Sequence, residues 1–220
     1  MSKRNQKRFD EYFAKVVLEY CFPERYHDLE VKDKPDLQGK GVGVEVTNCT
    51  PSDVREGFVR CRRVRAAGKS ATNRDLERIK QLRAIEITEH GIVWNQGCYS
   101  DDLDKSPLRV FLNAVENKLE KLNSATAGYA EREHYDLFVN SALDVADGTG
   151  VLETLSHLLS RIAQWNLQER KFEFVYLMTI NQSLVVFDMC HGYSYIKHLY
   201  NRIELLAQRA RAMIKGATNE

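Results

Sequence analysis

The chain has 220 residues, 43% hydrophobic and 29% charged, with a formal net charge of +1, an ordinary globular composition with enough length to bury a core. No apolar run approaches the roughly 18 residues needed to cross a bilayer, and the basic N-terminus lacks an apolar stretch, so we expect neither a membrane span nor a signal peptide. The five cysteines are scattered without a CxxC pair, which argues against a zinc ribbon or a disulfide framework and favours the reducing cytoplasm.

The first part of the chain is predicted to contain one helix and several short strands. Apolar side chains recur at helical spacing over residues 7–20, so we expect an amphipathic helix there that ends before Pro23. Residues 29–37 are predicted to form one or two strands, interrupted by charged residues and a proline. In residues 42–47 valine alternates with glycine, glutamate and threonine, which is typical of a strand.

A strongly basic segment follows. Helices are predicted over residues 51–67 and 73–83, and a hairpin that turns at residues 89–91 comes next. Between Arg55 and Arg83 ten Lys or Arg residues accompany three acids. Such a run is either a solvated helix surface or a surface that binds a polyanion, and a second basic stretch at the N-terminus favours the polyanion.

The second half of the chain is predicted to alternate between helices and strands. Ser106 followed by Pro107 marks a helix start, because serine caps a helix and proline fits its first turn. The expected later elements are a strand (135–140), a helix (151–165), a hairpin turning at 181–182 and a long helix (195–215). This alternation predicts an α/β fold in which helices flank a central mixed β-sheet.

Two carboxylates lie nine residues apart across a glycine-rich turn: Asp36 and Glu45. An even loop, such as a two-residue turn at Lys40–Gly41, would place them opposite each other on one face of the sheet, whereas an odd loop without a bulge would separate them. Two carboxylates beside a buried strand raise each other's pKa unless a cation lies between them. Mg²⁺ suits such a site, because it is a hard ion that one or two carboxylates can hold.

Pro35–Asp36 and Glu45–Val46–Thr47 resemble the PD and (D/E)XK motifs of the PD-(D/E)XK phosphodiesterase superfamily, the restriction-endonuclease-like nucleases. The resemblance covers the first 50 residues and Ser106–Asn140, in the order helix, strand with PD, strand with ExK, helix, strand. It implies a single nuclease-like domain over residues 1–220 with a restriction-endonuclease-like core. Residues 52–105 would then be a basic helical and hairpin insertion.

The resemblance also implies a function. The chain would be a metal-dependent nuclease that hydrolyses phosphodiester bonds of nucleic acid, with DNA as the first choice of substrate and a homodimer as a possible assembly. Asp36, Glu45 and the Val46 carbonyl would hold Mg²⁺, with Mn²⁺ as an alternative. The insertion would clamp backbone phosphates in a salt-sensitive manner through basic side chains: Arg60, Arg62, Arg63, Arg65 and Lys69.

One position departs from the family pattern, because Thr47 replaces the lysine that activates the attacking water. Some family members supply this lysine from the next helix. Counting about 100° per residue from Val115, the centre of the apolar stripe, Lys118 lies about 60° to one side and Lys121 about 120° away. Lys118 is therefore the candidate catalytic lysine, although it could equally be a surface lysine whose stem covers apolar surface.

Other assignments remain open. Lys69 and Lys80 in the insertion are weaker substitutes for the missing lysine. The family places a further glutamate on the first helix, and the resemblance favours Glu11 for this role. Asp10 and Glu19 are the alternatives, and each of the three acids could also be a solvated surface residue.

Two other functional hypotheses stand beside the nuclease. The ExT sequence could mark a catalytically degenerate nuclease fold that acts as an adaptor for nucleic acid or for protein. Alternatively the motif could be accidental, in which case Asp36 merely forms a turn in a structural α/β domain. The three hypotheses differ in whether the two carboxylates converge and whether a lysine ammonium lies near them.

Overall fold

The computed structural model describes residues 3–50, 77, 85–88, 91–94, 107–143, 151–179 and 182–217. The chain divides into two compact units, one formed by Met1–Asn48 with Phe111–Glu220 and the other by Cys49–Val110. In the second unit, strands β4 (Ile85–Thr88) and β5 (Gly91–Trp94) pair as an antiparallel hairpin.

Other predictions for this second unit cannot be compared with the structure. The helix predicted over residues 51–67 and the basic side chains of that segment lie outside the described residues. Of the helix predicted over residues 73–83, only Glu77 is described, and its backbone is helical. The insertion boundaries at 52 and 105 therefore stay a prediction.

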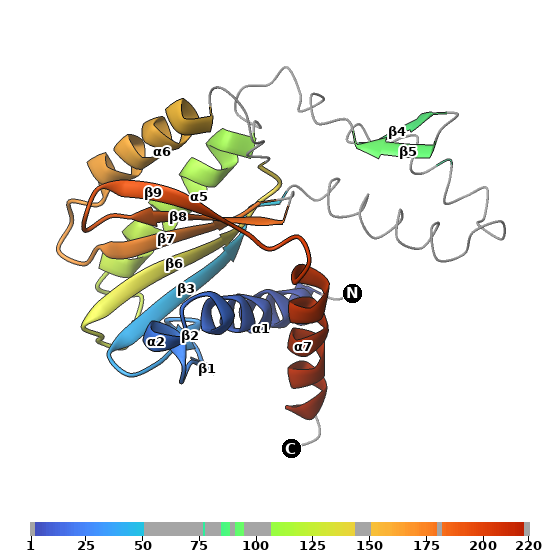
Figure 1. Ribbon diagram of the computed structural model, residues 1–220. Coiled ribbons are helices and arrows are strands. Elements are labelled where there is room, and N and C mark those ends of the chain that lie inside the picture. Colours follow the sequence, from blue (N-terminus) through green and yellow to red (C-terminus); the bar gives the residue numbers. More distant parts are fainter. Residues whose placement is uncertain are drawn as a thin grey trace. The chain divides into compact units, whose positions relative to one another are not determined.

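The first unit is built on one seven-stranded mixed sheet with the strand order β1-β2-β3-β6-β7-β8-β9 (Figure 1). The central strands β3, β6 and β7 are parallel, and the outer neighbours pair antiparallel. This arrangement confirms the predicted α/β fold with a central mixed sheet. The strands are β1 (Glu30–Val31), β2 (Leu37–Gln38), β3 (Val42–Asn48), β6 (His134–Asn140), β7 (Phe172–Met178), β8 (Ser183–Asp188) and β9 (Tyr193–His198).

Helices flank both faces of this sheet (Figure 1). On one side lie α1 (Lys3–Cys21), α2 (Pro23–Tyr26) and α7 (Ile203–Gly216), and on the other lie α5 (Pro107–Asn123) and α6 (Val151–Trp165). In the part of the chain that the structure describes, no helix is both long and apolar enough to cross a membrane.

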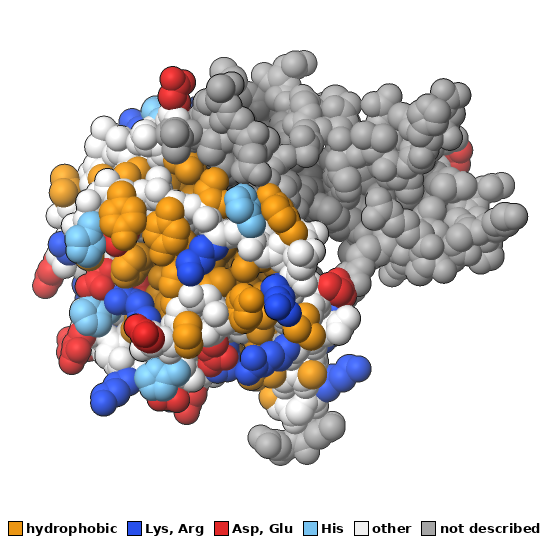
Figure 2. Space-filling view, viewed as in Figure 1, with side chains coloured by type: hydrophobic (Ala, Val, Ile, Leu, Met, Phe, Trp, Pro, Cys, Tyr) orange, Lys and Arg blue, Asp and Glu red, His pale blue; other side chains and the backbone are white. Residues whose placement is uncertain are grey.

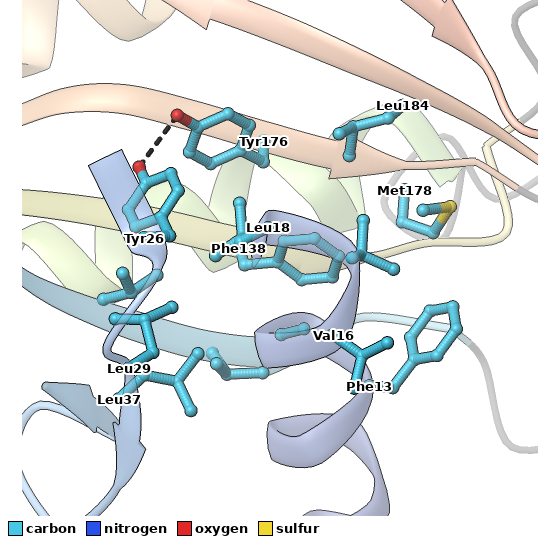
Figure 3. Close-up of a cluster of buried hydrophobic side chains, with 14 of the residues drawn as sticks. Phe13, Val16, Leu18, Tyr26, Leu29, Leu37, Phe138, Tyr176, Met178 and Leu184 are labelled. Carbon is cyan, nitrogen blue, oxygen red and sulfur yellow. Dashed lines mark hydrogen bonds between the residues drawn. The ribbon is translucent and has the colours of Figure 1, made fainter. Parts of the chain in front are cut away.

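A cluster of buried hydrophobic side chains lies between α1 and the sheet (Figure 3). Phe13 and Val16 of α1 pack there with the valines of β3, which are Val42, Val44 and Val46. Because successive side chains of a strand point to opposite faces, the residues between these valines point to the α5 side. This alternation directs Glu45 away from α1.

A fully buried carboxylate ties α2 to the centre of the sheet. Asp136 of β6 accepts hydrogen bonds from Arg25 Nε at 3.1 Å and Nη2 at 3.0 Å, from the Tyr26 hydroxyl at 2.6 Å and from the Phe174 backbone N–H at 2.9 Å. The Tyr26 hydroxyl also meets that of Tyr176 at 2.8 Å (Figure 3). Burial raises the pKa of Asp136, and the Arg25 guanidinium opposes that shift. The partners of this carboxylate thus fix the position of α2 against the sheet.

The helix predicted over residues 195–215 is wrong in its first part. Residues 193–198 form β9, which pairs antiparallel with β8, and α7 begins only at Ile203. Tyr193 and Tyr195 point to the same side of β9, and their rings stack at 5.9 Å. Pairing with β9 satisfies the backbone groups of β8, whose residues are all buried, and this requirement outweighs local helix propensity.

Strand β9 exposes aromatic surface. Tyr193 is 50% exposed, although it belongs to a strand of the central sheet. Figure 2 shows hydrophobic side chains gathered over the middle of this view of the molecule, with Lys, Arg and His side chains around them. Exposed apolar groups are normal on a protein surface, because polar groups cannot cover all of it.

Removal of the buried carboxylate should be costly for folding. Asp136→Ala leaves the Phe174 N–H without its acceptor and leaves Arg25 with Glu173, at 3.0 Å, as its remaining carboxylate partner. We therefore expect a loss of about 2 kcal/mol or more in the free energy of unfolding. Glu204→Ala is the matched control, because Glu204 pairs with Arg211 at 3.4 Å on the exposed surface of α7. The control should cost less than about 1 kcal/mol. Equal costs in chemical denaturation would contradict a stabilising role for the Asp136 network.

Candidate functional site

A two-residue turn connects β2 to β3. The backbone N–H of Gly39 donates to the Val42 carbonyl at 2.9 Å, which leaves Lys40 and Gly41 as the turn residues. Gly41 has a φ of 75°, a left-handed conformation that glycine adopts without steric cost. The loop is therefore even, which is the condition for two carboxylates to face each other across this hairpin.

The hairpin register brings Asp36 and Glu45 together. Leu37 pairs with Val44, so the next position outward along the same register sets Asp36 against Glu45. Both carboxylates are buried, with Asp36 5% and Glu45 3% exposed. A pair of acids at this depth needs a positive charge nearby, because like charges and desolvation both disfavour ionisation.

Lys118 of α5 supplies that positive charge. Its Nζ atom lies 2.5 Å from Glu45 Oε2 and 3.7 Å from Asp36 Oδ2. Val115 and Leu119, on the same helix, are both 1% exposed, whereas the Lys118 side chain is 18% exposed. The lysine therefore leaves α5 at the margin of the buried stripe and reaches both carboxylates. Lys121, about one helical turn further along α5, is exposed.

The backbone of β3 also takes part in the site. The Val46 N–H donates to Asp36 Oδ2 at 2.9 Å, which fixes one carboxylate oxygen against the strand. In an extended strand the N–H and C=O of one residue point to the same side, so the Val46 carbonyl lies on the Asp36 side of β3. Thr47, the residue at the motif lysine position, is partly buried at the next position of the strand.

Neighbouring groups shift the pKa of Glu45 in opposite directions. Burial raises the pKa of Glu45, the Lys118 ammonium lowers it, and the neighbouring Asp36 carboxylate raises it again. The Tyr129 phenol also acts on Glu45 and lowers its pKa. The ionised form of Glu45 therefore depends on the positive charge close to it.

Gly43 positions the proline of the PD pair. A Cβ atom on Gly43 would lie 2.4 Å from Pro35 Cγ and 3.2 Å from Arg132 Cγ, both shorter than an ordinary contact. Glycine at this point of β3 thus allows Pro35 to pack directly over the strand, next to Asp36. Arg132 also donates from Nη2 to the Gln38 side chain, so one arginine braces both strands of the hairpin.

Two residues of this region carried no signal in the sequence. Tyr129 and Arg132 belong to the connection between α5 and β6, outside any motif or periodic element. Their proximity to the hairpin arises from the parallel pairing of β3 with β6, which brings the start of both strands together. A search for aromatic or basic residues just before β6 would have found them, provided that this pairing was already known.

The acids predicted on the first helix have separate surroundings. Asp10 accepts a hydrogen bond from Asn48 Nδ2 at 3.1 Å, and Glu19 forms an ion pair with Lys15. Glu11 is 7% exposed on α1, the helix that packs on the valine face of β3. Among the described residues no three His, Cys, Asp or Glu side chains form a group that could hold a metal ion. The role of Glu11 therefore stays a prediction.

The remaining predicted residues lie outside the described part of the chain. These are the two weaker lysine candidates, Lys69 and Lys80, and the basic side chains assigned to phosphate binding, which are Arg60, Arg62, Arg63 and Arg65.

Comparisons with known proteins identify no relative of this chain. No protein-family model matches the chain, and neither a curated protein nor a solved structure is significantly similar to it. The chemistry of the site is therefore argued from its own residues. Asp36 and Glu45 offer carboxylate oxygens, the ligand type that Mg²⁺ prefers, so this donor pair fits the metal ion that the sequence predicts.

The packing at Gly43 can be tested by adding one methyl group. Gly43→Ala should displace Pro35 and cost about 1–3 kcal/mol in the free energy of unfolding, because the new Cβ overlaps a rigid proline ring. Gly216→Ala is the control, since a Cβ at Gly216 would meet no atom within 4 Å. Thermal or chemical denaturation measures both. If both variants were as stable as the wild type, the hairpin would not depend on this close approach.

Proposed function

We propose that this chain is a metal-dependent nuclease that hydrolyses phosphodiester bonds of nucleic acid, with DNA as the expected substrate. The observation that supports the proposal is the contact of one ammonium group, that of Lys118, with both Asp36 and Glu45. These are the residues that the resemblance to the PD-(D/E)XK superfamily selects. The elements α1, β2, β3, α5 and β6 follow the order helix, strand, strand, helix, strand, with α2 and β1 before β2 and with β4 and β5 before α5. Pro35–Asp36 lie immediately before β2.

Each residue of the cluster has a role in this proposal. Asp36 and Glu45, together with the Val46 carbonyl, hold Mg²⁺ or Mn²⁺. A bound ion of this kind polarises the scissile phosphate and lowers the pKa of the attacking water. Lys118 orients that water and offsets the negative charge that develops on the phosphate, in place of the lysine that Thr47 replaces.

The basic segment of residues 52–105 contributes substrate affinity rather than chemistry in this proposal. Its arginines neutralise backbone phosphates, so binding weakens as salt concentration rises and depends little on base sequence. The same proposal places the protein in the cytoplasm, the compartment that suits free cysteines. It also includes a homodimer as the assembly.

A catalytically degenerate adaptor is the second candidate function. The observation that favours it is the 2.5 Å contact between Lys118 Nζ and Glu45 Oε2, because a direct ion pair neutralises Glu45 without any chemistry. A protein of this kind would keep the fold and bind nucleic acid or another protein without cleaving it. The two candidates differ in a single measurable property, which is cleavage.

The test is Mg²⁺-dependent cleavage of single- and double-stranded DNA and RNA by the wild type and three variants. Asp36→Ala should abolish cleavage, because it removes a metal ligand. Lys118→Ala should reduce the rate by on the order of 10²-fold or more while nucleic-acid binding persists, since one electrostatic stabiliser of the transition state is lost. Lys121→Ala, on the exposed side of α5, is the control and should cleave like the wild type.

The outcomes separate the hypotheses. Full activity of Lys118→Ala, with none in Asp36→Ala, would contradict the catalytic role of Lys118 and point to Lys69 or Lys80. Absence of cleavage by the wild type in both Mg²⁺ and Mn²⁺ would contradict the nuclease proposal and leave the adaptor.

A further inference from the structure

A polar pocket of about 280 Å³ lies where α5 ends and β7 is about to begin. Its walls come from two connections, the one that follows α5 and the one that precedes β7. The side chains that matter for its chemistry are Ser124, Tyr129, Glu169 and Arg170. They provide an aromatic ring, a guanidinium and several hydrogen-bonding groups around one small space.

The shape of this pocket is held by hydrogen bonds between its two walls. Asn123 Nδ2 donates to the Arg170 carbonyl at 2.7 Å, and the Arg170 N–H donates to Asn123 Oδ1 at 2.9 Å. Gly128 has a φ of 68°, and a Cβ there would meet no atom within 4 Å. The two walls are therefore held in place by these hydrogen bonds. Gly128, which has no side chain, leaves space at one side of the pocket.

Tyr129 connects this pocket to the candidate active site. It lines the pocket, and its phenol interacts electrostatically with the Glu45 carboxylate. Burial and the Glu45 carboxylate both raise the pKa of Tyr129. A ligand in the pocket would thus lie one side chain away from the carboxylates and from Lys118.

Within the part of the chain that the structure describes, the ion pair of the Arg170 guanidinium is a long one. Its Nη2 atom is 3.9 Å from Glu131 Oε1, and the Glu131 side chain is 91% exposed. Exposed ion pairs of this length contribute little, so a phosphate group could replace Glu131 at small cost. The planar guanidinium binds phosphate oxygens in pairs, which a lysine does not.

We infer that this pocket binds one nucleotide unit of the nucleic-acid substrate. The base stacks on the Tyr129 ring, the Arg170 guanidinium holds the adjoining phosphate, and Ser124 and Glu169 meet polar edges of the base or sugar. Stacking on an aromatic side chain accepts any base, and it suits a strand that is single-stranded or unpaired at this point. The inference rests on the proposed function, because the nucleic-acid substrate identifies the ligand class.

In the experiment the full chain is titrated with each probe in the absence of metal ion. Binding is monitored through the NMR chemical shifts of the backbone amides. The probes are thymidine 5′-monophosphate, adenosine 5′-monophosphate, thymidine and inorganic phosphate. Both monophosphates should shift the amides of Gly128, Tyr129 and Arg170. Tyr129→Ala should weaken monophosphate binding by on the order of 10-fold, because base–aromatic stacking is lost, and Tyr129→Phe should retain binding.

A second pair of variants tests the phosphate contact. Arg170→Ala should weaken binding of the monophosphates and leave that of thymidine unchanged. Arg161→Ala removes an exposed arginine of α6 that stacks over Trp165, and it should bind every probe like the wild type. Retained amide spectra of each variant show that the fold is intact.

The results decide the inference independently of catalysis. If neither monophosphate shifts the pocket amides, or if inorganic phosphate binds as well as the nucleotides and Tyr129→Ala changes nothing, the pocket is not a nucleotide site. If monophosphates bind there as expected but the wild type cleaves no nucleic acid, the pocket inference stands and the nuclease proposal fails.

Discussion

The structure around β3 depends on one electrostatic constraint: two carboxylates that are almost completely buried need a positive charge between them. Asp36 and Glu45 are brought to this position by the two-residue turn and by the close approach of Pro35 to the strand. Lys118 meets both of them from α5, across the face of the sheet opposite to the valine core. The turn and Gly43 place the two carboxylates, and α5 supplies the lysine. Removal of Lys118 alone would leave two buried carboxylates without that positive charge.

A comparison with Asp136 shows why this arrangement suggests chemistry rather than stability. Asp136 sits on the neighbouring strand β6 and is surrounded by rigid donors, including a forked guanidinium and a tyrosine hydroxyl. Asp36 and Glu45 instead share a flexible lysine ammonium that is 18% exposed. A lysine can move aside for a metal ion or a phosphate, whereas the donors around Asp136 are fixed by the packing of α2.

Part of this site could be predicted from the sequence, because it depends on local periodicity. The nine-residue spacing with a glycine turn predicted the facing carboxylates, and the helical angle of about 60° predicted Lys118 at the margin of α5. Tyr129 could not be predicted, because its place depends on the parallel pairing of β3 with β6 over a long sequence separation. The misassigned helix start at Tyr195 has the same origin, since β8 determines the strand conformation of β9.

In the most direct test of the central claim, the metal-free chain is titrated with Mn²⁺ and the concentration of the free ion is measured by electron paramagnetic resonance. If Asp36 and Glu45 form one metal site beside Lys118, the wild type binds Mn²⁺, and Asp36→Ala weakens that binding by about tenfold or more. Equal Mn²⁺ affinity of the two proteins, or no binding by either, would contradict the account of these carboxylates as a metal site.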